Sequence, residues 1–158
     1  MALDFDQTII DIHTGGIWKN TINELATHVR PLFRHLIPAA HSAKIKIAVV
    51  TFSPQVKHIA DLLALHFPDF SHEILIRGRD RSWAYEGNGM KEGKQPFMAS
   101  AAEEFVATYP KLEITKKTTL LVDDDPNNIK MALKDGVRGI WLNPSKSHYL
   151  LKDIMRMP

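Results

Sequence analysis

Residues 2–8 read ALDFDQT, an apolar start that runs directly into two carboxylates one residue apart, Asp4 and Asp6. Side chains two residues apart on a β-strand point to the same face, so this stretch predicts a strand end carrying a pair of carboxylates. Such a pair repels unless one member is protonated or a cation lies between them. The stretch equally fits a polar strand exit with Asp6 as a turn residue, and the rest of the chain separates the two interpretations.

Composition sets the broad class. The 158 residues, of which 44% are hydrophobic and 24% charged, predict one globular domain spanning residues 1–158. Because the chain has no cysteine, disulfides, thiolate metal sites and cysteine nucleophiles are excluded. We see neither an apolar run of about 18 residues nor a signal peptide, and therefore expect a cytoplasmic protein without a membrane segment. The net charge of +2 gives no strong nucleic-acid signal.

Apolar stretches alternate with amphipathic ones along the chain. The stretch at residues 44–52 (KIKIAVVTF) ends in a continuous apolar run, which is typical of a strand buried on both faces of a parallel sheet. Further strands are expected near residues 2–6, 73–76, 118–122 and 139–143. Helices are expected at 21–36 with an interruption at Pro31, and at 54–66, 95–109, 126–136 and 145–157. This order predicts a three-layer α/β/α sandwich around a mainly parallel sheet of about five strands.

Two connecting segments stand out. Residues 8–20 contain a pair of adjacent glycines and read as a turn or small flap. Residues 77–93 read as a loop with three arginines, Trp83 and Tyr85. This loop either contacts an acidic or aromatic group of a substrate, or it is a solvated loop with Trp83 packed on the body of the protein.

Polar residues follow three of the expected strands. In parallel sheets, binding sites form beyond the carboxyl ends of the strands. Besides the opening pair, Thr51-Phe52-Ser53 follows the second strand and Asp123-Asp124-Asp125 follows the fourth. A hydroxyl group at a helix start favours an anion, although Ser53 also fits a simple helix cap. The aspartates together form an oxygen-rich pocket suited to Mg²⁺, although Asp125 before Pro126 also fits a cap.

An anion and Mg²⁺ in one pocket suggest phosphate. A carboxylate beside the metal can attack phosphorus and form an aspartyl-phosphate, and a second carboxylate can protonate the leaving group and then activate water. Such chemistry needs one more cation near the phosphate, for which Lys91 and Lys94 are the candidates. We favour Lys94, because it lies directly before an expected helix.

These motifs, in this order, resemble the haloacid dehalogenase (HAD) superfamily. The resemblance implies a Rossmann-like, HAD-like sheet and Mg²⁺ as the cofactor. It implies that Asp4 is the nucleophile, that Asp6 is the acid/base and that Lys94 steadies both the nucleophile and the phosphate. It also implies the remaining roles, which are phosphate binding by Thr51, Phe52 and Ser53, and metal binding by Asp4, Asp6 (through its backbone carbonyl), Asp123 and Asp124, with Asp124 the better match for the direct ligand.

Further details place the chain within that family. The second aspartate, Asp6, resembles the phosphatase branch, because the dehalogenases lack it, and the Asp123-Asp124 pair resembles the magnesium-dependent phosphatase type. Asn128 matches a position that is often acidic or Asn. Family members often carry a cap domain, but residues 9–20 are too short for a helical cap and residues 77–90 read only as a loop, so we expect a capless protein. Its open site suits a large or macromolecular phosphorylated substrate, or a small one if an oligomer supplies the lid, and the sequence does not decide between a protein, a nucleotide and a small molecule.

Three other functions compete with a phosphatase. A nucleotide-binding P-loop is suggested by residues 89–94 (GMKEGK), but the glycine spacing is one residue short and Gln95 replaces the needed Ser/Thr. A signalling receiver domain would carry its aspartate on a mid-chain strand, where this chain has Thr51. A HAD-like binding or scaffold module without turnover is the third, and it is kept as the main alternative.

Overall fold

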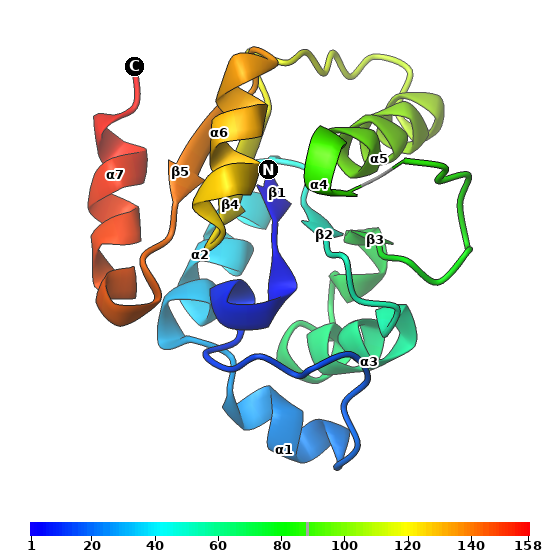
Figure 1. Ribbon diagram of the computed structural model, residues 1–158, viewed down its shortest axis with the longest axis vertical. Coiled ribbons are helices and arrows are strands. Elements are labelled where there is room, and N and C mark those ends of the chain that lie inside the picture. Colours follow the sequence, from blue (N-terminus) through cyan, green and yellow to red (C-terminus); the bar gives the residue numbers. More distant parts are fainter. Residues whose placement is uncertain (88) are drawn as a thin grey trace.

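The computed structural model describes residues 1–87 and 89–158, and its centre is a five-stranded parallel sheet (Figure 1). The strands lie in the order β3-β2-β1-β4-β5, and every pair of neighbours is parallel. Their bounds are β1 (Ala2–Leu3), β2 (Ala48–Val50), β3 (Leu75–Arg77), β4 (Leu120–Asp123) and β5 (Arg138–Trp141). The predicted α/β sandwich with about five strands is therefore confirmed.

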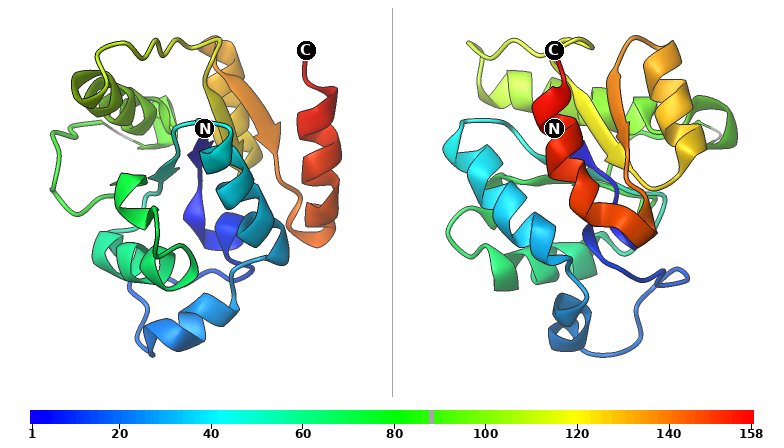
Figure 2. Two further views of the ribbon diagram at one scale, coloured as in Figure 1. Left: turned by 180° about the vertical axis from the view of Figure 1, so that it is seen from behind. Right: turned by 90° about the vertical axis from the view of Figure 1, so that its left-hand side faces the viewer.

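Helices cover both faces of the sheet. The α-helices are α1 (Ile22–Thr27), α2 (Pro31–Ser42), α3 (Val56–His66), α4 (Gly89–Glu92), α5 (Gln95–Thr108), α6 (Pro126–Lys134) and α7 (Leu150–Arg156). The views in Figure 2 place α2, α3 and α7 on one face of the sheet, with α5 and α6 on the other. Among the described residues, no helix combines the length and the apolar character needed to cross a bilayer.

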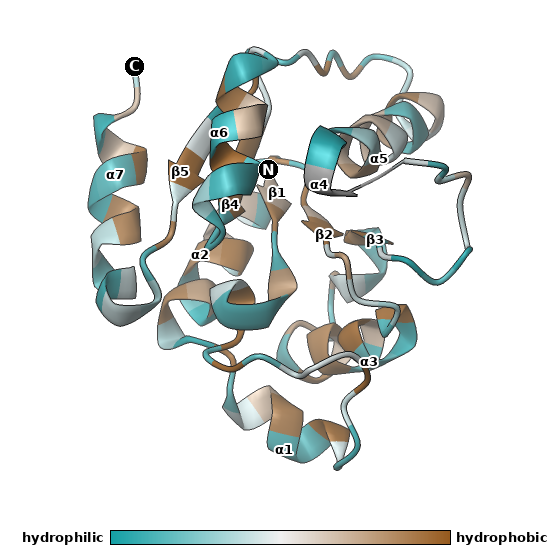
Figure 3. Ribbon diagram, viewed as in Figure 1, coloured by the Kyte–Doolittle hydropathy of each residue, from teal (hydrophilic) through white to brown (hydrophobic). Residues whose placement is uncertain are grey.

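The core is divided by the sheet into two clusters. Consecutive strand residues alternate between them, as the two-residue period of a strand requires: Ala2 packs with α5 and α6, whereas Leu3 packs under α2 and α3. Leu121 and Val122 on β4 repeat the alternation. Figure 3 shows the same pattern as brown strands and helix faces turned inward, with teal outward. The central strands β1, β2 and β4 are thus largely buried on both sides, and polar residues follow them at the carboxyl edge.

The start of the chain differs from the expected strand at residues 2–6. β1 ends at Leu3, and residues Phe5–Ile9 form a single wide helical turn in which Gln7 has a positive φ of 60°. The sheet bonding ends with the Asp4 amide, which donates to the Val122 carbonyl at 3.0 Å. Strand pleating was therefore the wrong reason to place Asp4 and Asp6 together, and this turn brings Asp6 to the site instead.

Several helix boundaries also differ. Pro31 divides the helix expected at 21–36, because α1 ends at Thr27 and Pro31 becomes the first residue of α2; the Thr21 cap of α1 is confirmed. The helix expected from Ser53-Pro54 begins at Val56, so Ser53 is not its cap residue. The segment at 145–157 forms a 3₁₀ turn (Pro144–Tyr149) followed by α7.

The expected loop at residues 77–93 contains the short helix α4, and its position 88 lies outside the described residues. Trp83 packs against Tyr85 and Phe97, and its indole nitrogen donates to the Gly78 carbonyl at 2.7 Å. Arg77 bonds to Ser100 and Glu104 on α5. Trp83 is therefore packed on the body of the protein, which was one of the two interpretations of this segment.

Candidate active site

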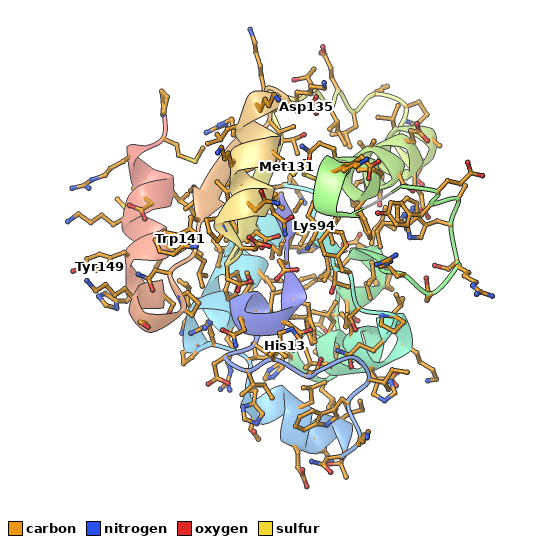
Figure 4. All side chains as sticks on the ribbon, in the orientation of Figure 1. His13, Lys94, Met131, Asp135, Trp141 and Tyr149 are labelled. Carbon is orange, nitrogen blue, oxygen red and sulfur yellow. The ribbon has the colours of Figure 1, made fainter. Side chains whose placement is uncertain are left out.

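A buried lysine joins the ends of β1, β2 and β4. Lys94, at the start of α5, is 1% exposed, and its Nζ donates to Asp4 Oδ1 at 2.6 Å and to the Val50 carbonyl at 2.7 Å. The same Nζ lies 3.2 Å from Asp123 Oδ2 and 4.7 Å from the centre of the Phe52 ring. Of the two candidate lysines, the structure therefore brings Lys94 to the strand ends. Lys91 is exposed and lines a separate hollow with Met131 and Asp135, two residues that Figure 4 labels at α6.

Burial and crowding change the acidity of these groups. Burial raises the pKa of Asp4 to about 6, against the opposing effect of Lys94, and burial followed by the charge of Asp4 raises the pKa of Asp123 to about 6. Burial alone would lower the pKa of Lys94, but the charges of Asp4 and Asp123 raise it. Lys94 therefore stays protonated, and it is one cation among several carboxylates.

Thr8 links Asp4 to Asp124. Its hydroxyl lies 3.2 Å from both Asp4 Oδ2 and Asp124 Oδ1, and it accepts a hydrogen bond from the Asp124 amide at 3.0 Å. A hydroxyl has one proton, so it donates to one carboxylate at a time. Asp124 is half-buried, and burial followed by the charge of Asp123 raises its pKa.

Asp123 is more heavily engaged than Asp124. Its Oδ1 accepts from the Asp125 amide at 2.9 Å, and its Oδ2 accepts from Asn128 Nδ2 at 3.0 Å and lies beside Lys94. Asp125 caps α6 by accepting from the Asn127 amide at 2.8 Å, so the cap interpretation of Asp125 is confirmed.

The residues after β2 form the opposite wall. Thr51 is 2% exposed, and its Oγ1 accepts from the Ser53 amide at 3.1 Å. Phe52 packs edge-on against Phe97. The Ser53 hydroxyl donates to the Gly16 carbonyl at 2.8 Å, so this side chain fastens residues 8–20, which we call the flap.

The flap also holds Asp6. Asp6 Oδ1 accepts two hydrogen bonds from Thr14, one from its amide at 3.0 Å and one from its hydroxyl at 2.8 Å. Gln55, which is 3% exposed, donates to Thr14 Oγ1 at 2.6 Å and accepts from the Trp18 amide at 2.9 Å. Because the amide nitrogen of Gln55 can only donate, the Thr14 hydroxyl proton is directed to Asp6.

All the predicted site residues line one cavity of about 590 Å³ at the carboxyl edge of the sheet. These residues are Asp4, Asp6, Thr51, Phe52, Ser53, Lys94, Asp123 and Asp124. Sequence reasoning missed His13 and Gly16 of the flap, which line the same cavity, and Figure 4 labels His13 beneath the turn that follows β1. His13 Nδ1 accepts from the Gly15 amide at 2.9 Å, and only the adjacent glycines hinted that this segment folds back.

Arg30 supports the site from beneath. It is 8% exposed and donates to the carbonyls of Gln7 at 3.0 Å, Thr8 at 3.0 Å and Pro144 at 3.3 Å. Burial lowers its pKa, and Asp11 and Asp124 oppose that effect. Arg30 fixes the turn between Asp6 and Thr8, and no motif in the sequence pointed to it.

The donor set fits a hard divalent cation. Asp4, Asp123 and Asp124 each bring one carboxylate oxygen to a common place, with all three oxygens within 4.8 Å of one another. Three carboxylates with one lysine leave negative charge in a largely buried place, and Mg²⁺ prefers carboxylate oxygens. Asp6 does not belong to this group by its side chain. This acidic cluster can therefore hold a metal, and its chemistry suits Mg²⁺.

The fold was compared with solved structures. An uncharacterised protein from Corynebacterium glutamicum is similar over 98% of this chain and 90% of its own, with 16% identity and a TM-score of 0.57. The HAD domain of effector protein Lem4 from Legionella pneumophila (inactive mutant) is similar over 98% of this chain and 91% of its own, with 18% identity and a TM-score of 0.55. The chain has the fold of a HAD domain.

A part of a longer protein shares the HAD fold of this chain. DsGPDH of Dunaliella salina matches 90% of this chain at 16% identity and a TM-score of 0.53, but this chain spans only 23% of the length of DsGPDH. No family model and no curated protein matches the sequence. The likeness to solved structures therefore concerns the HAD fold, and the chemistry has to be argued from the residues of the site.

Proposed function

We propose that this protein is a Mg²⁺-dependent phosphomonoesterase of the HAD superfamily that works through an aspartyl-phosphate on Asp4. The observation that carries the proposal is the bond from Lys94 to Asp4 Oδ1, made within the one cavity that also contains Thr51, Asp123 and Asp124. The buried ammonium group is positioned to hold a nucleophilic carboxylate and to attract the phosphate oxygens.

Each residue has a separate part in the proposed reaction. Asp4 attacks phosphorus, and the bond from phosphorus to the leaving oxygen breaks as Asp6 gives that oxygen a proton. Thr51 and Lys94 hold the phosphate oxygens during the transfer. Asp6 then takes a proton from a water molecule, which attacks phosphorus, releases phosphate and regenerates Asp4.

The metal would be held by Asp4, Asp123 and Asp124, together with the backbone carbonyl of Asp6. Mg²⁺ would offset the charge of the carboxylates and of the phosphate, so that two anions can approach each other. Asp124 is proposed as a direct ligand because the oxygens of Asp123 are already bonded to the Asp125 amide and to Asn128.

We further propose that residues 1–158 act as one catalytic domain without a cap and work in the cytoplasm. The flap is anchored by Ser53 and Gln55, and it borders the cavity at His13 and Gly16. A cavity bordered by so short a segment suits a phosphate carried on a large substrate or on a small molecule that extends beyond the cavity.

The alternative is a HAD-like module that binds a partner without turnover. It is kept because the likeness to solved structures, at 16% and 18% identity, concerns the fold alone, and one fold can host many functions. The filled catalytic positions argue for the phosphatase.

The test is phosphate release from p-nitrophenyl phosphate by the full chain. We expect activity with Mg²⁺, none with EDTA, and a loss of about 10⁴-fold or more for Asp4→Asn, because the nucleophile is removed. Activity that survives both EDTA and the substitution would refute the proposal. A folded wild-type protein that is inactive on a broad panel of phosphoesters would favour the binding module.

A further inference from the structure

A half-exposed tryptophan lies one strand away from the acidic cluster. Trp141 ends β5 and is the register partner of Asp123 on β4, so it lies level with the site at a spacing of about 4.8 Å between strands. Its indole Nε1 donates to the Asp124 carbonyl at 2.7 Å, which fixes the orientation of the ring. The side chain is nevertheless 46% exposed, and no other aromatic ring among residues 1–87 and 89–158 stacks on it.

This indole borders a hollow of about 290 Å³ (the Trp141 hollow) that does not belong to the catalytic cavity. Figure 4 shows Trp141 and Tyr149 on the side of the molecule that carries α7. The faces of the Tyr149 ring are approached by His148 and Lys152, so Trp141 is the platform available for stacking. The other lining groups can form hydrogen bonds, namely Asn143, Lys146, Ser147 and Asp153.

The mixture of groups indicates the kind of ligand. An indole face favours stacking by a planar ring. The side chains around it include both hydrogen-bond donors and acceptors, which suit a ring whose edge also carries donors and acceptors. A nucleobase has such an edge, whereas a phenyl ring has none. Base stacking on aromatic side chains tolerates all bases, because every base has a π-face.

The separation of the Trp141 hollow from the catalytic cavity points to the same class, since the two spaces share no lining residue. Asp124 separates the two spaces, since its carboxylate joins the acidic cluster while its carbonyl accepts from Trp141. In an aryl phosphate the ring is attached directly to the ester oxygen, so the ring would stay inside the catalytic cavity. A ring that reaches the Trp141 hollow needs a spacer between itself and the phosphate, and a ribose provides one.

We propose that the Trp141 hollow binds the base of a nucleoside monophosphate whose phosphate lies at Asp4. This inference rests on the proposed phosphatase activity and names the substrate class for the same site. Trp141 is then a specificity-determining residue, and Asp124 connects the recognition of the base to the acidic cluster.

The first test compares adenosine 5′-monophosphate with ribose 5-phosphate, which has the same leaving alkoxide and lacks the base. We expect the nucleotide to have the higher kcat/KM by about 5- to 150-fold, the range given by one base stacked on an aromatic ring. Trp141→Ala should remove this preference, and Trp141→Phe should keep part of it. Tyr109→Ala is the matched control, because Tyr109 is an exposed aromatic residue at the end of α5, outside both spaces, and the preference should persist.

The second test measures binding and needs no turnover. The three tryptophans give three indole N–H signals in NMR, and the signal missing from Trp141→Phe identifies Trp141. Adenosine, which carries no phosphate, should shift that signal selectively in the wild-type protein. Equal kcat/KM for the two phosphates, or an unmoved Trp141 signal at millimolar adenosine, overturns the inference. Failure of the phosphatase proposal would appear separately, as inactivity on p-nitrophenyl phosphate, and the adenosine titration would still decide.

Discussion

Lys94 donates to Asp4 Oδ1 at 2.6 Å although the two residues are 90 positions apart, and both lie in the interior at the carboxyl edge of the sheet. The bond joins the first residue after β1 to the residue that precedes α5. It places a positive charge beside the carboxylate that we propose as the nucleophile, and it makes the stability of the fold depend on a residue of the proposed catalytic site.

Lys94→Met should therefore lose both activity and stability. The thioether cannot replace the ammonium group, so Asp4 and Asp123 would stay buried without their cation, which typically costs about 3–5 kcal/mol of unfolding free energy. Urea denaturation without metal and phosphate release with Mg²⁺ measure the two effects. Lys91→Met is the control, because Lys91 is exposed and lies outside the catalytic cavity. A Lys94→Met protein as stable and active as wild type would contradict this role.

Asp124→Asn should abolish stabilisation by Mg²⁺. A metal that binds only the folded state raises the unfolding free energy by about 2.7 kcal/mol at a hundredfold excess over its dissociation constant. Among the three carboxylates of the cluster, that of Asp124 has the fewest hydrogen bonds to the protein, which leaves it available to the metal. Thermal unfolding with and without Mg²⁺ measures the shift. The control is Asp125→Asn one residue later, at the cap of α6, which should keep the shift. A full Mg²⁺ shift in Asp124→Asn would assign the metal to other ligands.

Gln55→Glu should disturb Asp6 although the change is nearly isosteric. A carboxylate at position 55 cannot donate to Thr14, so the Thr14 hydroxyl would turn its proton away from Asp6. We expect a loss of stability of about 1–3 kcal/mol from the broken buried bond, and a lower kcat because Asp6 is no longer held. Unfolding and steady-state kinetics test this together, and unchanged values in both would show that the flap is held in another way.

Glu73→Gln should change the acid stability of the fold. The hydrogen bond from His41 lowers the pKa of Glu73 below its ordinary value of 4.5. A carboxylate with a depressed pKa in the folded state adds stability above its unfolded pKa, and this is lost as the pH falls through the folded value. The melting temperature of wild type should thus fall more steeply below about pH 4.5 than that of Glu73→Gln, with Glu103→Gln, an exposed change on α5, as the control. Parallel curves for all three proteins would contradict the prediction.

The order of motifs was enough to predict the sheet and the cavity residues that follow its strands. Strands that are buried on both faces can be recognised in a sequence as continuous apolar runs. Polar residues that directly follow such strands lie at the carboxyl edge of the sheet, where binding sites form. Asp4, Thr51 and Asp123 were therefore found from sequence. The sequence favoured Lys94 over Lys91 without separating them fully, because both belong to one polar segment. The choice depends on where α5 begins, and Lys94 directly precedes that helix.

What the sequence did not reveal depends on tertiary contacts. Thr14 and Gln55 belong to a chain of hydrogen bonds between the flap and the start of α3, whereas His13 is bonded to the Gly15 amide within the flap. No local sequence pattern indicates these partners. Ser53 looked like a helix cap because Ser-Pro is a good local start, yet its hydroxyl is taken by Gly16 and the helix begins later. Arg30 was missed because its three carbonyl partners come from distant turns.

The position of β1 in the sheet has a consequence for synthesis of the protein on the ribosome. β1 pairs with β2 on one side and with β4 on the other, and it is made before both of them. Asp4 therefore has no fixed place until the ribosome has released the segment carrying Asp123, and the acidic cluster cannot form before that moment. The proposed activity should therefore appear in one step, when the aspartates and Lys94 first come together.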